Sequence, residues 1–399
     1  MEHHLEAVET LILSILVLYV GAVLTRRIGF LSRNSIPPAV TGGLLCSILV
    51  AFIFGVWELK ITFDTALRDL LLLVFFSTIG LTARLRLLVA GGKALVLLLV
   101  IAVGFLVLQN STGVLLALGF DAHPAMGLFA GSISFAGGHG TAIAWGNEAA
   151  KAGFAVAGDV GIAFATFGLI AGGVIGGPIA ERLIRRHRLQ ASSDEGSAKS
   201  AAAEARAGGQ VSVDDVLGTI FLLALCVGLG DQVNKLLFAE GVLLPGFLTA
   251  MVVGIVLTNL ADARGRQVND MVIDLFGDVS LRIFLAISLM SMDLLILAQA
   301  MGPMLIVLFV QVTLMTFIAV FIVFRVMGRD YDAAIISSGF AGLGLGATPV
   351  AIGNMQAVTS KHGPSPKAFL VVPLVGAFFI DIANALVIKF FLGLPMFQV

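Results

Sequence analysis

Ten apolar runs, each about as long as a membrane-crossing helix, recur along the chain and are separated by polar segments. They cover residues 10–25, 38–57, 66–83, 94–118, 158–182, 215–237, 243–261, 279–298, 303–325 and 368–392. A helix needs about 20 mostly apolar residues to cross the hydrocarbon core of a bilayer. The pattern therefore predicts an all-α polytopic membrane protein with ten transmembrane helices.

Two glycine-rich stretches, at about 125–150 and 333–358, interrupt this pattern. They are too rich in glycine for ordinary spans and too apolar for solvated loops. AGGHGTAIAWGN at 136–147 matches LGLGATPVAIGN at 343–354, with identical pairs at Gly137/Gly344, Thr141/Thr348, Ala144/Ala351, Gly146/Gly353 and Asn147/Asn354. Broken backbone is tolerated at membrane depth only inside protein or beside a water-filled cavity. We therefore expect two re-entrant hairpins.

The two halves of the chain also match outside these motifs. PPAVTGG at 37–43 aligns with PGFLTAM at 245–251, and residues 75–95 align with 285–305, which places Gly92 opposite Gly302. A repeat of five spans must invert in the membrane. We expect a first inverted repeat at 1–183, a cytoplasmic linker at 184–213 and a second inverted repeat at 214–399. The linker is rich in Ser, Ala, Glu and Gly, which predicts flexibility.

The distribution of positive charge predicts the orientation. With the N-terminus outside, 19 of the 24 Lys and Arg residues fall on the cytoplasmic side, as the positive-inside rule requires. Both termini are then periplasmic. If each motif were a full crossing, the repeat would be parallel and the positive charges would segregate less cleanly, so re-entrant hairpins are favoured. The acidic N-terminus predicts that the first apolar run is a retained helix and not a cleaved signal peptide.

Composition narrows the functional class. The chain is 58% hydrophobic and 12% charged, about half the charge of a soluble domain, and its net charge is −1. No basic face for nucleic acid is present, and the sequence contains no HExxH, GxSxG, P-loop or CxxC motif. The two cysteines lie in apolar runs and indicate no disulfide framework or metal site. We expect a transporter without a cofactor, and not an enzyme.

The paired motifs carry the residue types that bind a small anion and a hard cation. Helix N-termini present N–H groups to a carboxylate, whereas unwound carbonyls and Thr hydroxyls suit sodium. The candidate binding residues in the motifs are Gly137, Gly138, His139, Gly140, Thr141, Asn147, Gly344, Gly346, Thr348 and Asn354.

A structural role is the alternative for each of these motif residues. The glycines could serve close helix packing alone, and the asparagines could hold freed backbone groups. His139 has no imidazole counterpart in the second motif, which favours a packing histidine over a metal or proton role.

Asp381 lies deep in the last apolar run, where a carboxylate is costly and is a functional candidate by default. Asn384 is three residues further along, on the same helical face. We expect sodium near Thr141, Thr348, Asp381 and Asn384. The alternative for Asp381 is a carboxyl group that is buried neutral or paired structurally. Arg84, Arg86, Arg282 and Asp293 lie near span ends, and no role is assigned to them.

Several motifs resemble the bacterial sodium–glutamate symporter family, the glutamate:sodium symporters (ESS family). They are FFSTIGL at 75–81, SISFAGGHGTAIAW at 132–145, GLIAGGVIGGP at 168–178, GLGLGATPVAIGNMQAV at 342–358 and the tail at 363–397. The resemblance implies sodium-driven import of L-glutamate across the bacterial inner membrane by alternating access. It also implies two inverted repeats and a homodimer.

The residues alone indicate only a secondary transporter of a small anionic or zwitterionic solute. A carrier of another amino acid or a dicarboxylate, coupled to sodium or protons, stays open as an alternative. A channel or a membrane receptor is the alternative from another class.

Overall fold

The computed structural model describes residues 2–29, 31, 37–84, 92–191, 212–239, 244–265, 269–292 and 301–397. Most of the predicted linker, Arg86 and Asp293 lie outside this range. The chain forms two compact units, each of which combines segments from both halves of the sequence. Unit 1 comprises Met1–Leu85, His139–Ala163 and Val213–Gly302, and unit 2 comprises Arg86–Gly138, Phe164–Ser212 and Pro303–Val399.

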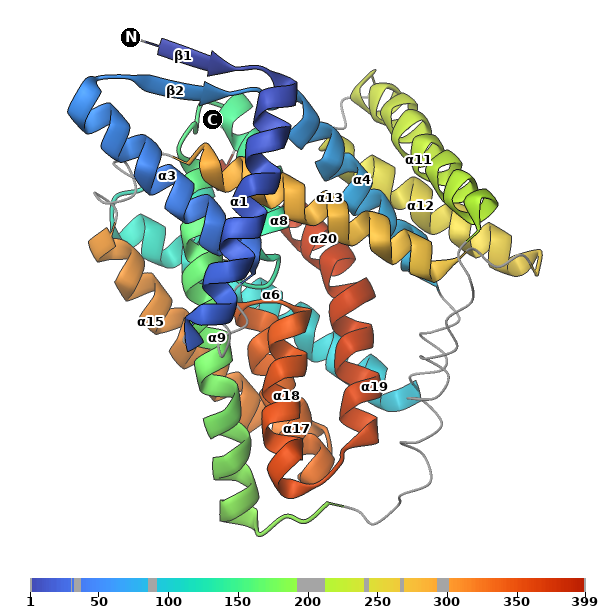
Figure 1. Cartoon of the computed structure of the whole chain (residues 1–399). Helices are drawn as coiled ribbons and strands as arrows, with labels where there is room; N and C mark the ends of the chain where they lie inside the picture. The colour runs from blue at the N-terminus through green and yellow to red at the C-terminus, as the bar shows by residue number, and fades with distance from the viewer. Residues whose placement is uncertain are drawn as a thin grey trace. The chain divides into compact units, whose positions relative to one another are not determined.

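Unit 1 is built mainly from six long helices, three from each half of the chain. They are α1 (Ala7–Arg27), α3 (Pro38–Trp57), α4 (Ala66–Thr82), α11 (Val213–Ala239), α12 (Gly246–Ala263) and α13 (Asp270–Met290). α1 packs on α3 and α11 packs on α12, while α4 packs on α12 and α13 packs on α3 (Figure 1). Helices at corresponding positions of the two halves therefore have corresponding neighbours.

Unit 1 also holds α8 (Gly138–Lys151) from His139 onward, the first turns of α9 (Ala157–His187) and one small sheet. Strands β1 (Glu2–Leu5) and β2 (Lys60–Phe63) pair in parallel, with Glu2 opposite Lys60. The His4 Nδ1 and Thr62 Oγ1 atoms, 3.1 Å apart, form a hydrogen bond between the strands. The sheet was not predicted, because four-residue strands are too short to show a clear alternation.

Glycines set the close approach of α4 and α12 in unit 1. A Cβ atom on Gly254 would lie 3.0 Å from the Ser77 carbonyl oxygen, and one on Gly80 would overlap the Met251 carbonyl and lie 3.2 Å from the Gly254 Cα. Small residues at such crossings let two helix backbones come into contact in a membrane.

We predict that Gly80→Ala destabilises the protein by about 1–3 kcal/mol, because its methyl group would force α4 and α12 apart. The measurement is the thermal denaturation midpoint in detergent. Gly228→Ala in α11 is the matched control, since nothing lies within 4 Å of the position that its Cβ would occupy. A midpoint for Gly80→Ala equal to that of Gly228→Ala would contradict the prediction.

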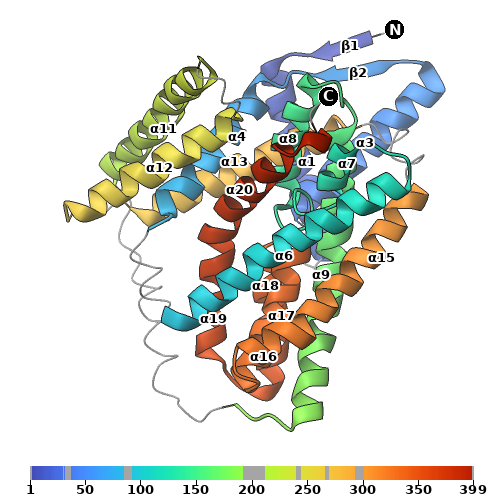
Figure 2. The same cartoon turned by 180° about the vertical axis from the view of Figure 1, so that it is seen from behind.

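Unit 2 contains the other long helices and both π-helical segments. Its described elements are α6 (Gly92–Gly119), α7 (Pro124–Phe129), most of α9, α15 (Met301–Phe317), η1 (Ile318–Val323), α16 (Phe324–Val326), α17 (Tyr331–Leu345), α18 (Thr348–His362), α19 (Pro366–Leu374), η2 (Val375–Phe379), α20 (Ile380–Leu392) and η3 (Pro395–Phe397). α6 packs against α7, α19 and α20, and α17 packs against α18, α19 and η1 (Figure 2).

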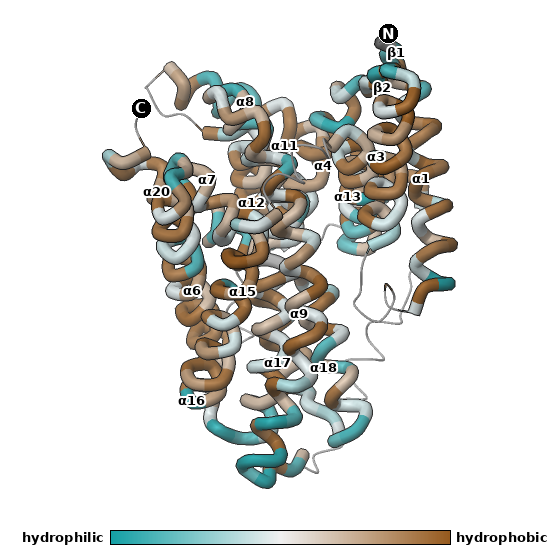
Figure 3. Tube along the Cα trace, turned by 90° about the vertical axis from the view of Figure 1, so that its left-hand side faces the viewer, coloured by the Kyte–Doolittle hydropathy of each residue, from teal (hydrophilic) through white to brown (hydrophobic). Residues whose placement is uncertain are grey.

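Seven described helices are long and apolar enough to cross a membrane: α1, α3, α6, α9, α11, α12 and the continuous segment Met301–Val326. Figure 3 shows that most of the length of these helices is hydrophobic and that hydrophilic residues lie mainly near helix ends and connections. This confirms a helical polytopic membrane protein. The expected run at 66–83 is the 17-residue helix α4, and the last run is divided by Pro373 and η2 into α19 and α20.

The expected span at 279–298 is displaced in the structure. α13 begins nine residues earlier, at Asp270, and its described residues end at Met290. Its first half is amphipathic: Val272 and Ile273 are buried, whereas Asp278 is exposed. A search for continuous apolar runs misses such a half, because hydropathy averages over both faces of the helix.

Candidate functional site

The second glycine motif lies at a break between two helices of unit 2. α17 ends at Leu345 and α18 begins at Thr348, with Gly346 and Ala347 between them. Gly342 faces Ala351 and Gly339 faces Met355, so α18 runs back along α17 as a helical hairpin (Figure 1). The carbonyl end of α17 and the amide end of α18 meet at the break, and no side chain caps α18.

The open end of this hairpin is fastened by hydrogen bonds. The Tyr331 hydroxyl donates to the Gly363 carbonyl oxygen at 2.5 Å, and the Ser365 hydroxyl donates to Asp332 at 2.6 Å. Asp330 caps α17 by accepting from the Ala333 N–H at 2.7 Å. The two ends of the hairpin are thereby fixed to each other, and the break at Gly346 lies at its opposite end.

The two glycine motifs approach each other within unit 2. Gly138 has a φ of 66°, in the left-handed region that favours glycine, and a Cβ atom there would lie 3.4 Å from the Gly346 carbonyl oxygen. Gly346 has a φ of −142°, which does not require glycine. The close packing around this position is the reason that a residue without a Cβ atom fits there. A Cβ atom on Gly346 would lie 3.2 Å from the Leu169 Cα. Among the motif glycines named as candidates, only Gly138 fits the expectation of a positive-φ turn.

Two buried glutamines hold the broken backbone near the motifs. The Gln109 side-chain amide on α6 donates to the Gly344 carbonyl oxygen at 3.0 Å. The Gln311 amide on α15 donates to the carbonyl oxygens of Gln109 and Ala130 at 3.0 and 2.9 Å. These bonds satisfy carbonyl groups that water cannot reach in a membrane interior.

A second polar group joins α6 and α20 to the turns before the first motif. The Asn110 side-chain oxygen accepts from the Ser132 N–H at 2.7 Å. The Ser132 hydroxyl donates to the Asn384 side-chain oxygen at 2.5 Å, and the Asn384 amide donates back to the Ser132 carbonyl oxygen at 3.0 Å. All three side chains are buried. Asn384 therefore has backbone and hydroxyl partners that fix it in place.

We predict that Gln311→Leu lowers the free energy of unfolding by about 2 kcal/mol, because it removes the side-chain donor of the Ala130 carbonyl and the additional donor of the Gln109 carbonyl. The measurement is the thermal denaturation midpoint. Gln356→Leu, on the exposed face of α18, is the control for the same change of side chain. Equal midpoints for the two variants would show that the buried amide does not stabilise the fold.

The Asn354 side chain holds backbone carbonyl groups, which is the structural alternative to a role in binding. Its amide donates to the Gly172 carbonyl oxygen of α9 at 2.9 Å and reaches the Ser338 carbonyl at 3.5 Å. It therefore ties α18 to α9 and to α17. A Cβ atom on Gly176 would collide with this amide, so glycine in α9 makes room for the tie.

Thr348 lies against η2, which leads into Asp381 in the first turn of α20. A Cβ atom on Gly376 in η2 would lie 2.6 Å from the Thr348 hydroxyl oxygen. Asp381 is five residues further along, about 7 Å of helix rise. Its side chain is half-buried, and neither it nor the Thr348 hydroxyl has a hydrogen-bond or ion-pair partner within the described part of the chain. π-Helical segments such as η2 often occur at functional sites.

The candidate residues of the first motif from His139 onward belong to unit 1. His139 and Thr141 are buried, and Gly140 lies against Phe75, whose ring would be 3.2 Å from an added Cβ. The Asn147 side-chain oxygen accepts from Arg68 at 3.3 Å, and its amide donates to Asp69 at 3.3 Å. Unit 2 holds the other candidates: Gly137, Gly138, Gly344, Gly346, Thr348, Asn354, Asp381 and Asn384.

Sequence reasoning missed Gln109, Asn110, Ser132 and Gln311. The available signal was a carboxamide inside an apolar run, which is costly in a membrane unless it is bonded. The two carboxamides of α6 and the one of α15 interrupt such runs at 109–110 and 311. Their partners could not be found from sequence, because the bonded residues are up to 252 positions apart.

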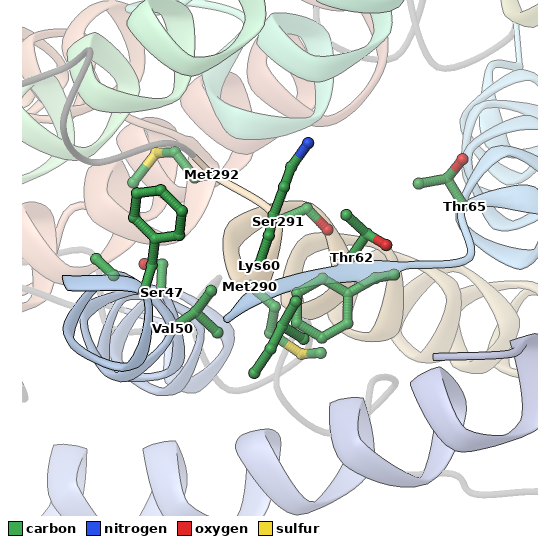
Figure 4. A pocket seen from close by; sticks show the side chains of 12 residues that line it. Ser47, Val50, Lys60, Thr62, Thr65, Met290, Ser291 and Met292 are labelled. Carbon is green, nitrogen blue, oxygen red and sulfur yellow. The ribbon is translucent and has the colours of Figure 1, made fainter. Parts of the chain in front are cut away.

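A separate pocket of about 380 Å³ lies within unit 1, between α3, β2 and the end of α13. Ser47, Lys60, Thr62 and Ser291 contribute polar groups to it, as Figure 4 shows. None of the motif residues lines it. Within the described residues, no group of three His, Cys, Asp or Glu side chains could hold a metal ion, and Cys46 and Cys226 are free thiols.

Comparison with known proteins identifies the family. The model described as sodium/glutamate symporter matches residues 3–364. The sodium/glutamate symporter of Escherichia coli (strain K12) is 43% identical over 399 residues, which covers 99% of each protein. That of Haemophilus influenzae is 41% identical over 396 residues, or 98% of each. These matches confirm the expectation of a transporter and not an enzyme, and the chain belongs to the sodium/glutamate symporter family.

Proposed function

We propose that this protein imports L-glutamate across the bacterial inner membrane, coupled to sodium, by alternating access. The main support in the structure is the break between α17 and α18, where opposite helix ends meet beside Thr348. Thr348 lies against Gly376 of η2, and Asp381 follows five residues later. The family membership and the names of the relatives supply the substrate and the ion.

The break offers complementary groups for a carboxylate and a cation. The N–H groups that begin α18 and the Thr348 hydroxyl bind a substrate carboxylate, assisted by the positive end of the helix dipole. The Asp381 carboxylate and carbonyl oxygens at the end of α17 bind sodium, which prefers oxygen ligands. Gly137, Gly138, Gly344 and Gly346 let backbone approach closely around the site, and Asn384 positions the turn that leads into Gly137.

This arrangement gives a physical reason for coupling. A substrate carboxylate beside Asp381 is repelled while the site lacks a cation, and sodium placed between the two carboxylates reverses that repulsion. Each ligand therefore raises the affinity for the other, as thermodynamic linkage requires. The first-motif residues His139, Gly140, Thr141 and Asn147 belong to unit 1, and this part of the proposal rests on unit 2 alone.

Several observations support two inverted five-span repeats with re-entrant hairpins. α3 and α12 begin after Pro37 and Pro245, whose φ and ψ angles agree within 4°. α17 begins at Tyr331, 207 residues after the start of α7 at Pro124, which is the spacing of the two motifs. The helix pairs of unit 1 correspond between the halves. In this proposal ten spans put both termini on one side of the membrane, and the distribution of Lys and Arg favours the periplasm for them and the cytoplasm for the linker.

The proposed function is tested by uptake of labelled L-glutamate into proteoliposomes that contain the purified protein. With an inward sodium gradient, we expect accumulation above the external concentration, and replacement of sodium by choline should abolish it. Unchanged accumulation in choline would overturn sodium coupling. Preferential uptake of a dicarboxylate would reassign the substrate. Equilibration without accumulation would indicate a channel, and binding without uptake would indicate a receptor.

The proposal includes a homodimer, by analogy with the family resemblance. Size-exclusion chromatography with light scattering of the detergent-solubilised protein tests this part. A monomer at micromolar concentration would remove the homodimer from the proposal and leave the transport function unaffected.

A further inference from the structure

We propose that the carboxyl-terminal end of α9 and the end of α18 form a binding site for the headgroup of an anionic phospholipid. The site lies within unit 2 and is a pocket of about 820 Å³. It is lined by Gly177, Pro178, Glu181, Arg182, Arg185, Arg186 and Lys361. Four cationic side chains and one carboxylate give this lining a net positive charge.

The length of α9 places the pocket at the membrane surface. Residues 160–180 of this helix carry no charged side chain, and 21 helical residues extend about 32 Å. This length matches the hydrocarbon core of a bilayer, which is about 30 Å thick. Glu181 and the arginines that follow it therefore lie at the level of the lipid headgroups.

The single carboxylate of the pocket already has two partners. The Lys361 ammonium lies 3.1 Å from one Glu181 oxygen, and the Arg185 guanidinium lies 3.2 Å from the other. Glu181 thereby joins α9 to α18. Arg182 and Arg186 have no hydrogen-bond or ion-pair partner within the described residues, and both are exposed. They remain available to an external anion.

The spacing of these cations suits a phosphate group. Arg182, Arg185 and Arg186 stand at i, i+3 and i+4, so their side chains leave one face of α9. Lys361 faces them from α18, as the ion pair to Glu181 shows. Guanidinium groups bind phosphate oxygens with two parallel hydrogen bonds.

The lipid fits the pocket better than a soluble phosphate does. Gly177 and Pro178 lie one turn closer to the hydrocarbon core than the charged residues, and an added Cβ on Gly177 would meet no atom within 4 Å. This uncharged floor leaves space for the glycerol backbone and the start of the acyl chains. Basic pockets at the ends of membrane helices bind anionic headgroups in this way.

Native mass spectrometry of the purified full-length protein tests the site, with phosphatidylglycerol and phosphatidylcholine as probes. The wild-type protein should retain phosphatidylglycerol in preference to phosphatidylcholine. Arg182→Gln with Arg186→Gln should weaken phosphatidylglycerol binding about 30-fold, from the usual contribution of two basic residues near an anionic surface. Arg182→Lys with Arg186→Lys should restore part of the affinity, because lysine keeps the charge but not the paired hydrogen bonds, and this separates lost charge from lost folding.

Arg325→Gln with Arg329→Gln is the matched control, because both arginines are exposed and belong to unit 2. This pair should leave phosphatidylglycerol binding unchanged. Equal lipid binding by the Arg182/Arg186 variant and the wild type would overturn the proposal, and so would equal binding of the two lipids. Displacement of the lipid by millimolar inorganic phosphate would reassign the pocket to soluble anions. These measurements need neither glutamate nor sodium, so they are independent of the transport proposal.

Discussion

Asp381→Asn is expected to raise the sodium concentration for half-maximal glutamate uptake at least tenfold, or to abolish sodium dependence. The substitution keeps the size of the side chain and removes its charge. One favourable interaction of about 1.4 kcal/mol corresponds to a factor of ten in affinity, and a carboxylate that faces a cation away from bulk water contributes at least that much. Uptake into proteoliposomes at graded sodium concentrations measures the change.

The Asp381 prediction needs a control for the loss of one acidic residue. Asp278→Asn on α13 serves this purpose, since its side chain is 71% exposed and lies 3.8 Å from Arg282. This variant should keep the wild-type sodium dependence. Asn384→Asp is informative beside it, because it would disrupt the reciprocal bonds to Ser132 and should reduce uptake without restoring Asp381→Asn. Full sodium dependence in Asp381→Asn would remove Asp381 from the ion site.

Arg84→Met is expected to destabilise the protein by about 3 kcal/mol. The Arg84 guanidinium, on the chain just after α4, is only 7% exposed and forms an ion pair with Asp270 at the start of α13. It also lies 3.9 Å from Asp262 at the end of α12. Removing Arg84 takes a nearby positive charge from Asp262, whose side chain is 14% exposed, whereas Asp270 is 52% exposed and keeps much of its hydration. Methionine keeps the apolar stem of the side chain.

The thermal denaturation midpoint of the detergent-solubilised protein measures the effect of Arg84→Met. Arg282→Met is the matched control, because this arginine is 62% exposed and its pair with Asp278 is solvated. Exposed pairs contribute between 0 and about 1 kcal/mol, so this midpoint should stay close to that of the wild type. Equal losses in the two variants would show that Arg84 has no special structural role. A double Asp262→Asn, Asp270→Asn variant should partly compensate Arg84→Met.

Arg84 illustrates how a residue near a predicted span end can be misjudged. From sequence alone it has no assigned role, because a positive charge beside an apolar run is usually a solvated, snorkelling side chain. The structure buries it where three helices end together. The partners come from residues 262 and 270, more than 170 positions away, and no local pattern indicates them.

Much of the helical framework could be predicted from sequence, because membrane insertion requires long apolar runs. α1, α3, α6, α9, α11 and α12 follow such runs within a few residues at most of their ends. α13 could not be placed in this way, since its first half buries one face and exposes the other. Hydropathy also does not predict that η2 divides the last apolar run. Pro373 lacks a backbone N–H donor and lies inside the helix just before η2.

The motifs stand out in the sequence, but the particular contacts of their residues do not. Glycine and threonine at matched spacings mark Gly344 and Thr348, and a carboxylate in an apolar run marks Asp381. The roles of the asparagines diverged: Asn354 bonds to the Gly172 carbonyl, whereas Asn147 bonds to Arg68 and Asp69. Identical residues at matching positions of the two motifs therefore have different partners, because the surrounding fold determines which groups lie within reach.

The sequence by itself determined the membrane class, the family, the position of both motifs and the presence of a carboxylate, Asp381, inside an apolar run. These follow from hydropathy, spacing and residue type, which are local properties of the chain. The tertiary structure decided that Gly138 meets Gly346, that Gln109 and Gln311 satisfy the broken backbone, and that His139 and Asp381 belong to different compact units. Such pairings depend on which distant backbone groups lack donors after the helices pack, and this is settled only in three dimensions.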